Sequence, residues 1–91
     1  MSPPVTITLL TQSSCGFCEH AKQVLDRLSA DYALHVTEID LAGDEGRRLA
    51  ARAGVLFAPG VLVEGEPFSF GRLSERKLRR TLDKRLQPDR T

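Results

Sequence analysis

The order of strand-like and helix-like segments most constrains the fold of this chain. Residues 5–11 alternate β-branched and apolar side chains and predict a strand. An amphipathic helix follows, with apolar residues spaced mostly three or four apart. Its apolar stripe consists of Phe17, Ala21, Val24, Leu25 and Leu28. Residues 33–39 predict a second strand, and a strand–helix–strand unit favours a parallel, right-handed crossover.

Two further helices are predicted downstream. The first starts with acidic residues at Asp44 and has basic residues before Gly54, an order that complements the helix dipole and places glycine at the C-cap. The last helix starts after Ser74, a favourable N-cap residue. Leu73 and Leu78 occupy the two positions of a hydrophobic staple around this N-cap. Both helices therefore have sequence signals that define an end.

A hairpin completes the pattern. The apolar runs 61–63 and 68–70 flank the four turn-forming residues 64–67. The whole order is then β-α-β-α-β-β-α, which predicts an α/β fold with a mixed four-stranded sheet flanked by three helices. Because 91 residues suffice for one domain and leave no room for a second, we predict a single domain over residues 1–91.

The chain has two cysteines, and both lie in the motif Cys15-Gly-Phe-Cys18 between the first strand and the first helix. Unpaired backbone N–H groups and the positive dipole end stabilise an anion at a helix N-terminus. A thiol with an ordinary pKa of about 8.5 is expected to shift downward there, and its thiolate is the nucleophile. Because Cys15 lies closer to the unpaired N–H groups, we predict that Cys15 attacks a substrate and Cys18 resolves the product.

Three other interpretations of the cysteine pair stay open at this point. A structural disulfide across four residues would stabilise the fold by about 2 kcal/mol, less than a bridge across a long loop. A zinc site would need further ligands, for which His20, His35 and carboxylates are available. Packed, unreactive thiols are the third alternative. A CxxC motif that opens a helix after a strand favours redox chemistry, so we predict a redox pair and no metal site.

Together with later segments, this motif resembles the thioredoxin/glutaredoxin superfamily over most of the chain. The stretch Gly54-Val-Leu-Phe-Ala-Pro59 is similar to the family's segment that runs from a glycine to a proline, and residues 61–66 are similar to the hairpin after it. The stretch Gly71-Arg-Leu-Ser74 resembles the start of the last thioredoxin helix. The resemblance implies a thioredoxin fold and a small glutaredoxin-like dithiol protein. Such a protein would be a thiol–disulfide oxidoreductase in cell redox homeostasis.

The resemblance also implies roles for residues outside the cysteine pair. The peptide bond before Pro59 is expected to be cis, with this proline beside the two sulfur atoms. The backbone of Ala58 is expected to pair with a bound substrate strand. Gly16 and Phe17 complete the expected substrate contacts around the cysteines. Ser74 and its N–H group, at a helix N-terminus, suit a carboxylate, which makes glutathione a candidate co-substrate.

The chain departs from both branches of the superfamily. Thioredoxins have a tryptophan before the first cysteine and a buried aspartate in the first strand, where this chain has Ser14 and Leu9. Glutaredoxins have a lysine shortly before their motif, where this chain has Gln12 and Ser13. The motif also differs by one residue from the Cys-Gly-Phe-Ser of monothiol glutaredoxins, which bind an iron–sulfur cluster. A non-catalytic metal- or cluster-binding module is therefore the alternative function.

The remaining expectations concern partners and location. We expect a disulfide-bearing protein or a glutathione mixed disulfide as substrate, and glutathione or a separate reductase as electron donor. We expect a monomer without a bound organic cofactor. The 13 basic and 12 acidic residues nearly cancel, which predicts no general attraction to nucleic acid or anionic membranes. Without a signal-peptide pattern or an apolar stretch of about 20 residues, we expect a cytoplasmic protein.

Basic residues are concentrated in the segment 72–91. We interpret this segment as a helix whose charged face is solvated. Docking of an acidic partner or of nucleic acid is the alternative, with Arg79 and Arg80 as the residues to reverse in a test.

Overall fold

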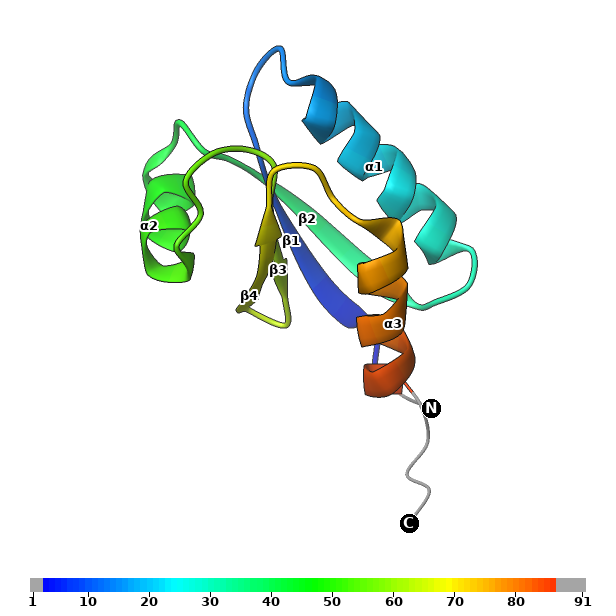
Figure 1. Ribbon diagram of the computed structural model, residues 1–91. Coiled ribbons are helices and arrows are strands. Elements are labelled where there is room, and N and C mark those ends of the chain that lie inside the picture. Colours follow the sequence, from blue (N-terminus) through cyan, green and yellow to red (C-terminus); the bar gives the residue numbers. More distant parts are fainter. Residues whose placement is uncertain (1–2, 87–91) are drawn as a thin grey trace.

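The computed structural model describes residues 3–86, and residues 1–2 and 87–91 of the predicted domain lie outside this range. The elements follow the predicted order β-α-β-α-β-β-α (Figure 1). They are β1 (Val5–Thr11), α1 (Gly16–Ser29), β2 (Leu34–Asp40), α2 (Asp44–Ala53), β3 (Gly60–Val63), β4 (Glu66–Phe70) and α3 (Glu75–Leu86). None of the helices described has both the length and the apolar character needed to span a bilayer.

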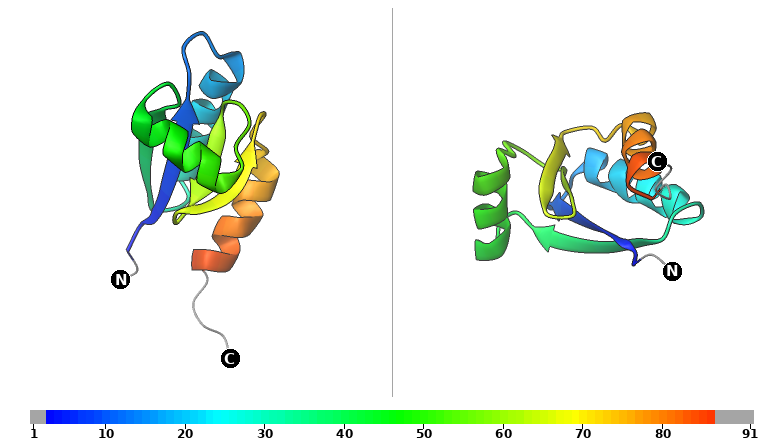
Figure 2. Two further views of the ribbon diagram at one scale, coloured as in Figure 1. Left: turned by 90° about the vertical axis from the view of Figure 1, so that its left-hand side faces the viewer. Right: turned by 90° about the horizontal axis from the view of Figure 1, so that it is seen from below.

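The four strands form one mixed sheet in the order β2-β1-β3-β4. β1 is parallel to β2, whereas β3 is antiparallel to both β1 and β4. α1 and α3 cover one face of the sheet and α2 lies on the other (Figures 1 and 2). The predicted four-stranded sheet flanked by three helices is therefore confirmed.

Each face of the sheet has its own apolar cluster. The larger cluster joins β1 and β3 to α1 and α3, and it includes the fully buried side chains of Ile7, Leu9, Leu28, Leu78 and Leu82. The smaller cluster lies toward α2 and consists of Leu10, Ala50, Val55 and Leu62. Burying one such leucine side chain contributes about 1.5–3 kcal/mol, so the α1–α3 side holds most of the hydrophobic stabilisation.

The start of α1 differs from the predicted apolar stripe. Phe17 was expected to be the first residue of the stripe, but its side chain is 54% exposed. Cys18 takes that place instead, because it lies three residues before Ala21 and is only 2% exposed. The spacing of three and four residues was identified correctly, but the first turn of the helix is rotated by one residue relative to the expectation.

The hairpin turn is shorter than the sequence suggested. Only Glu64 and Gly65 form the turn, with φ values of 53° and 81°. Two consecutive residues with positive φ are typical of the tight type I′ turn that matches strand twist. Consequently Pro67, expected in the turn, lies inside β4. Proline is tolerated there because β4 is an edge strand, and a register shift between Val61 and Leu62 interrupts the adjacent ladder.

Ion pairs between α1 and α3 connect the two helices on their shared face. Arg27 of α1 donates to Glu75 of α3 at 2.8 Å, and Arg79 of α3 donates to Asp31 at 2.9 Å. The Arg27 guanidinium, through its hydrogen bond, holds the pKa of Glu75 below its ordinary value. Both partners are partly solvent-exposed, so the pair stabilises the contact only modestly.

Replacing Glu75 by glutamine tests this contact through its pH dependence. The folded-state pKa of Glu75 is lowered, so the ionised carboxylate stabilises the fold above its unfolded pKa of about 4.3. That contribution disappears as the pH falls through the folded-state value. We expect Glu75→Gln to lower the free energy of unfolding near neutral pH and to match the wild type in acid. Asp26→Asn, which removes an exposed carboxylate of α1 that forms no ion pair within residues 3–86, is the charge-matched control in urea denaturation.

Gly46, inside α2, provides a second stability test. An added Cβ would lie 2.1 Å from the carbonyl oxygen of Asp40, a backbone atom that cannot move without displacing the end of β2. Alanine normally stabilises a helix interior by about 1 kcal/mol relative to glycine. Here we expect Gly46→Ala to destabilise the protein by about 1–3 kcal/mol through overpacking. Gly16→Ala, whose Cβ would meet no atom within 4 Å, is the control, and equal effects of the two would contradict the prediction.

Candidate active site

The cysteine pair lies at the N-terminus of α1, as predicted. Cys15 is the N-cap residue with extended backbone angles, and its Sγ accepts a hydrogen bond from the backbone N–H of Cys18 at 3.1 Å. The two cysteines are joined by a disulfide with a Cα–Cα distance of 5.2 Å. One sulfur therefore already occupies the position at which an unpaired helix N–H group stabilises negative charge.

The two sulfur-bearing residues differ in exposure. Cys15 is half-buried at the surface, whereas Cys18 is packed against the core. The neighbouring carboxylate of Glu19 forms an ion pair with Lys22 at 3.3 Å and raises the pKa of that lysine. Because Cys15 is the more exposed of the two cysteines, an attacking disulfide or thiol can reach it from solvent, whereas Cys18 is accessible mainly through Cys15.

The sheet register brings Pro59 to the end of β1. Leu10 pairs with Gly60, the first residue of β3. Pro59, which directly precedes Gly60, therefore lies at the end of the sheet where β1 leads into the cysteine loop. The Ala58–Pro59 peptide bond is cis, the isomer expected from the resemblance. The N–H of Gly71 donates to the Pro59 carbonyl at 2.8 Å. Three loops, those before α1, before β3 and before α3, thus meet at one end of the molecule (Figure 1).

The residue before this proline has unused backbone groups. The side chain of Ala58 is buried, which fixes its position in the loop. Within residues 3–86, neither its N–H nor its C=O forms a hydrogen bond. Backbone groups that lack an internal partner are suited to pairing with an extended chain.

Exposed apolar side chains lie at this end of the molecule. Leu56, Phe57 and Phe70 were not among the site residues predicted from the sequence. Leu56 is 80% exposed and Phe57 54% exposed, directly before the cis peptide bond. Phe57 and Phe70 meet edge to face, with ring centroids 5.0 Å apart. Phe17 is similarly exposed between the cysteines. A cluster of large exposed apolar residues marks an interaction surface. The sequence signal that could have identified this surface is the pair of large apolar residues Leu56 and Phe57 in the loop just before Pro59.

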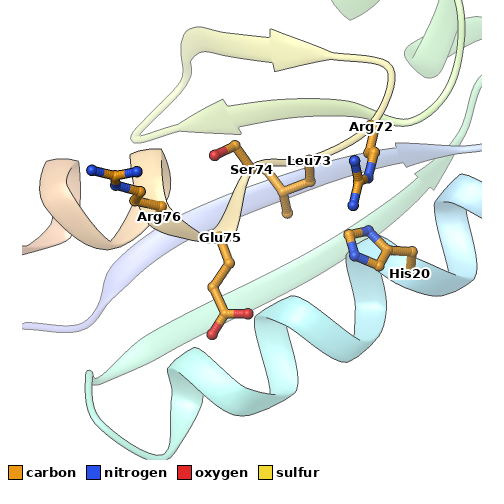
Figure 3. A pocket seen from close by; sticks show the side chains of 6 residues that line it. All are labelled: His20, Arg72, Leu73, Ser74, Glu75 and Arg76. Carbon is orange, nitrogen blue, oxygen red and sulfur yellow. The ribbon is translucent and has the colours of Figure 1, made fainter.

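Ser74 lies at the N-terminus of α3, as predicted, where its Oγ accepts a hydrogen bond from the Lys77 N–H at 3.2 Å. It lines a pocket of about 400 Å³ together with His20 and Arg72. In Figure 3 the Arg72 side chain approaches His20, whereas the Ser74 hydroxyl points away from both. Within the described residues, Nδ1 of His20 is buried without a hydrogen-bond partner. The hydroxyl of Ser74 therefore caps the helix, and the pocket is lined by basic residues together with the carboxylate-bearing Glu75.

Metal ligands are not gathered in the part of the chain that the structure describes. Within residues 3–86, no group of three or more His, Cys, Asp or Glu side chains is placed to hold a metal ion. His35, considered as a ligand from the sequence, lies exposed on the edge strand β2.

The model of one protein family matches most of the sequence. Residues 6–83 match the family described as glutaredoxin-like domain (DUF836). The chain belongs to this family. No curated protein sequence matches the glutaredoxin-like chain. Its matched segment contains the whole cysteine motif, the cis-proline loop and most of α3.

Solved structures agree with the fold of this glutaredoxin-like protein. A mutant thioredoxin from Halobacterium salinarum NRC-1 superposes with a TM-score of 0.71 at 23% identity, over 94% of this chain and 78% of that one. A structure titled as that of a malarial protein gives a TM-score of 0.69 at 19% identity, over 93% of this chain and 100% of that one. The fold is therefore that of thioredoxin, and the close cysteine pair indicates a thioredoxin-like redox role.

The glutaredoxin-like protein lacks a buried acid at the expected thioredoxin position. Leu9 occupies the place of the first-strand aspartate and is fully buried. Among residues 3–86, no polar or charged residue is classed as fully buried. The surroundings of β1 are thus apolar, and the part of the chain that the structure describes supplies no alternative buried carboxylate.

The capping role of Ser74 predicts a stability effect. Replacing an N-cap serine by alanine typically costs about 1 kcal/mol, so we expect Ser74→Ala to lower the free energy of unfolding by about that amount. Ser74→Asp should retain most of the stability, because aspartate is an equally good N-cap. Ser13→Ala, at an exposed loop position, serves as the control in denaturant unfolding. Equal stability of the Ser74→Ala and Ser13→Ala variants would show that the hydroxyl does not cap α3.

Proposed function

We propose that this glutaredoxin-like protein is a thiol–disulfide oxidoreductase that exchanges its Cys15–Cys18 dithiol or disulfide with the disulfides or thiols of other molecules. The observation that carries the proposal is the disulfide at the N-terminus of α1, with an accessible Cys15 and a buried Cys18. A purely structural bridge across so short a loop would constrain little of the unfolded chain. A structural role also gives no reason for Cys15 to be accessible from solvent while Cys18 is buried.

In the first step, the reduced protein acts through Cys15. The Cys18 N–H that donates to Sγ of Cys15, together with the dipole of α1, favours the thiolate form. This thiolate attacks one sulfur of a substrate disulfide. A mixed disulfide forms with Cys15, and the other substrate sulfur leaves as a thiolate that takes up a proton from water.

Cys18 completes the exchange. After losing its proton, its sulfur attacks Sγ of Cys15 in the mixed disulfide, and the short separation of the two residues allows ring closure. The second substrate sulfur leaves, the substrate has gained two electrons and two protons, and the Cys15–Cys18 disulfide has formed. The burial of Cys18 supports this order, because an external sulfur meets Cys15 first.

The oxidised protein must then be reduced by two thiol equivalents. We propose glutathione or the dithiol of a separate reductase as the donor, with no bound organic cofactor. For glutathione, we propose that a carboxylate binds at the N-terminus of α3 beside Arg72 and Arg76, in a pocket that Glu75 also lines. The two thiols of the donor become a disulfide as Cys15 and Cys18 return to the dithiol.

The proposed substrate is an extended segment that bears a disulfide. The unpaired backbone groups of Ala58 would hydrogen-bond such a segment beside Pro59. The exposed rings of Phe57 and Phe17 would contact its apolar side chains. Gly16 leaves open space next to Cys15, since an added Cβ there would meet no atom within 4 Å.

Single cysteine variants test the proposal. We expect Cys15→Ser to lower the rate of insulin reduction and of glutathione mixed-disulfide reduction to the uncatalysed background. Cys18→Ser should retain the first step but trap the mixed disulfide, seen as one added substrate mass in non-reducing mass spectrometry. Circular dichroism of both variants controls for folding. A folded wild type that reduces neither substrate, with glutathione or with dithiothreitol as donor, would overturn the proposed function.

A further inference from the structure

A groove lies between the edge strand β4 and α3, next to the proposed active site. Its volume is about 470 Å³. Phe68, Ser69 and Phe70 line the strand side, and Ser74, Lys77, Arg80 and Thr81 line the helix side. The groove therefore combines an apolar floor with a cationic wall.

The cations at this groove form no ion pair within the described residues. Within residues 3–86, Arg72, Lys77 and Arg80 have no carboxylate oxygen within 4.0 Å. All three are solvent-exposed. Arg79, one residue away, is already paired with Asp31. The basic helix identified in the sequence thus has one side where Arg79 forms an ion pair and another, at the groove, where Lys77 and Arg80 are unpaired in the described chain.

Two contacts connect the elements on either side of this groove to each other and to the proline loop. Glu66 at the start of β4 forms an ion pair with Arg85 near the end of α3 at 3.2 Å, which joins the two walls. At the other end, Gly71 donates its N–H to the carbonyl of Pro59. A chain that lies in the groove and leaves past Gly71 therefore reaches the loop that contains the cis proline.

We propose that the groove between β4 and α3 binds an extended, acidic segment of the protein whose disulfide reacts at Cys15. The choice of substrate in this inference rests on the proposed function, whereas the binding itself does not. Carboxylates of the segment would pair with Arg72, Lys77 and Arg80, and its apolar side chains would contact the phenylalanine rings. The outer edge of β4, unpaired in the described chain, offers backbone groups along the same line.

The spacing of the cations favours a polypeptide over a small anion. Lys77 and Arg80 are three residues apart along α3, a rise of about 4.5 Å, and Arg72 lies before the helix begins. A compact anion would meet these cations alone and leave the phenylalanine residues of the same groove unused. An extended segment can place several carboxylates along the cations, because alternate side chains lie on the same side of a strand.

Binding of a cysteine-free peptide tests the docking surface independently of redox chemistry. The probe is a fluorescein-labelled peptide of alternating glutamate and valine, and the matched peptide has glutamine in place of each glutamate. Fluorescence anisotropy in about 0.15 M salt keeps distant charges screened. We expect Arg80→Glu to weaken binding of the acidic peptide about fivefold, the scale of an exposed ion pair. Arg76→Glu is the control, because Arg76 is an equally exposed arginine of α3 that does not line this groove.

Several outcomes would overturn the docking surface. One is equal weakening by Arg80→Glu and Arg76→Glu, which would reflect net charge alone. Others are equal affinity for the glutamate and glutamine peptides, or displacement of the acidic peptide by inorganic phosphate at the same charge concentration. Tighter binding of a single-stranded oligonucleotide with the same sensitivity to Arg80→Glu would assign the groove to nucleic acid instead.

A second pair of peptides links docking to exchange. Each carries a disulfide next to either the glutamate or the glutamine segment, and the ratio of their reduction rates is compared between wild type and both variants. We expect the wild type to favour the acidic peptide and Arg80→Glu to lose that preference. Equal rates with both peptides in the wild type would overturn the inference and leave the proposed function intact. Binding of the acidic peptide without reduction of either disulfide peptide would support the docking surface and overturn the proposed function.

Discussion

The pairing of β1 with a strand on each side is the constraint on which the other features depend. Its parallel partner β2 fixes the crossover through α1, and its antiparallel partner β3 fixes the register that sets Gly60 opposite Leu10. β1 ends immediately before the cysteine loop, and β3 begins immediately after Pro59. A shift of this register by one residue would exchange the two faces of β3 and move Pro59 along the sheet relative to the cysteine loop. The arrangement of the candidate site is therefore a consequence of strand pairing rather than of the motif alone.

Local patterns explain why much of this fold could be predicted from sequence. The glycine at the end of α2, the serine before α3 and the apolar periodicities all act through contacts within a few residues. The rotation of the first turn of α1 and the length of the hairpin turn were not predictable in the same way. Phe17 is exposed because of where the sheet ends relative to the helix, and Pro67 joins β4 because β4 has no outer neighbour in the described chain. Both depend on tertiary packing that a pattern along the chain does not contain.

The candidate site also combines features that local sequence determines with features that depend on tertiary packing. The cysteine pair and the capping serine follow from helix-terminus chemistry, which is local. The exposed apolar residues Leu56 and Phe57 come from the loop before β3 and Phe70 from the end of β4, and only the sheet brings them together. The sequence already showed Leu9 in place of the buried aspartate of thioredoxins. The structure adds that Leu9 is fully buried, so an apolar side chain occupies the position of that carboxylate. In the described chain no buried carboxylate stands in for that aspartate, so in the proposed exchange the proton of Cys18 passes to water or to the departing substrate thiolate.

The basic residues of α3 show how one helix can serve packing and recognition at once. Arg79 lies on the side that meets α1, where pairing with Asp31 holds the two helices together. Arg80 follows it by one position, which rotates its side chain by about 100° around the helix axis and places it at the groove beside β4. Charge reversal at these two neighbours would therefore act on different properties. At Arg79 it would place like charges together within the fold, whereas at Arg80 it would alter a surface that the fold leaves unpaired. Net charge along the sequence cannot separate these two roles, because the helical rotation between adjacent residues alone decides which face each one occupies.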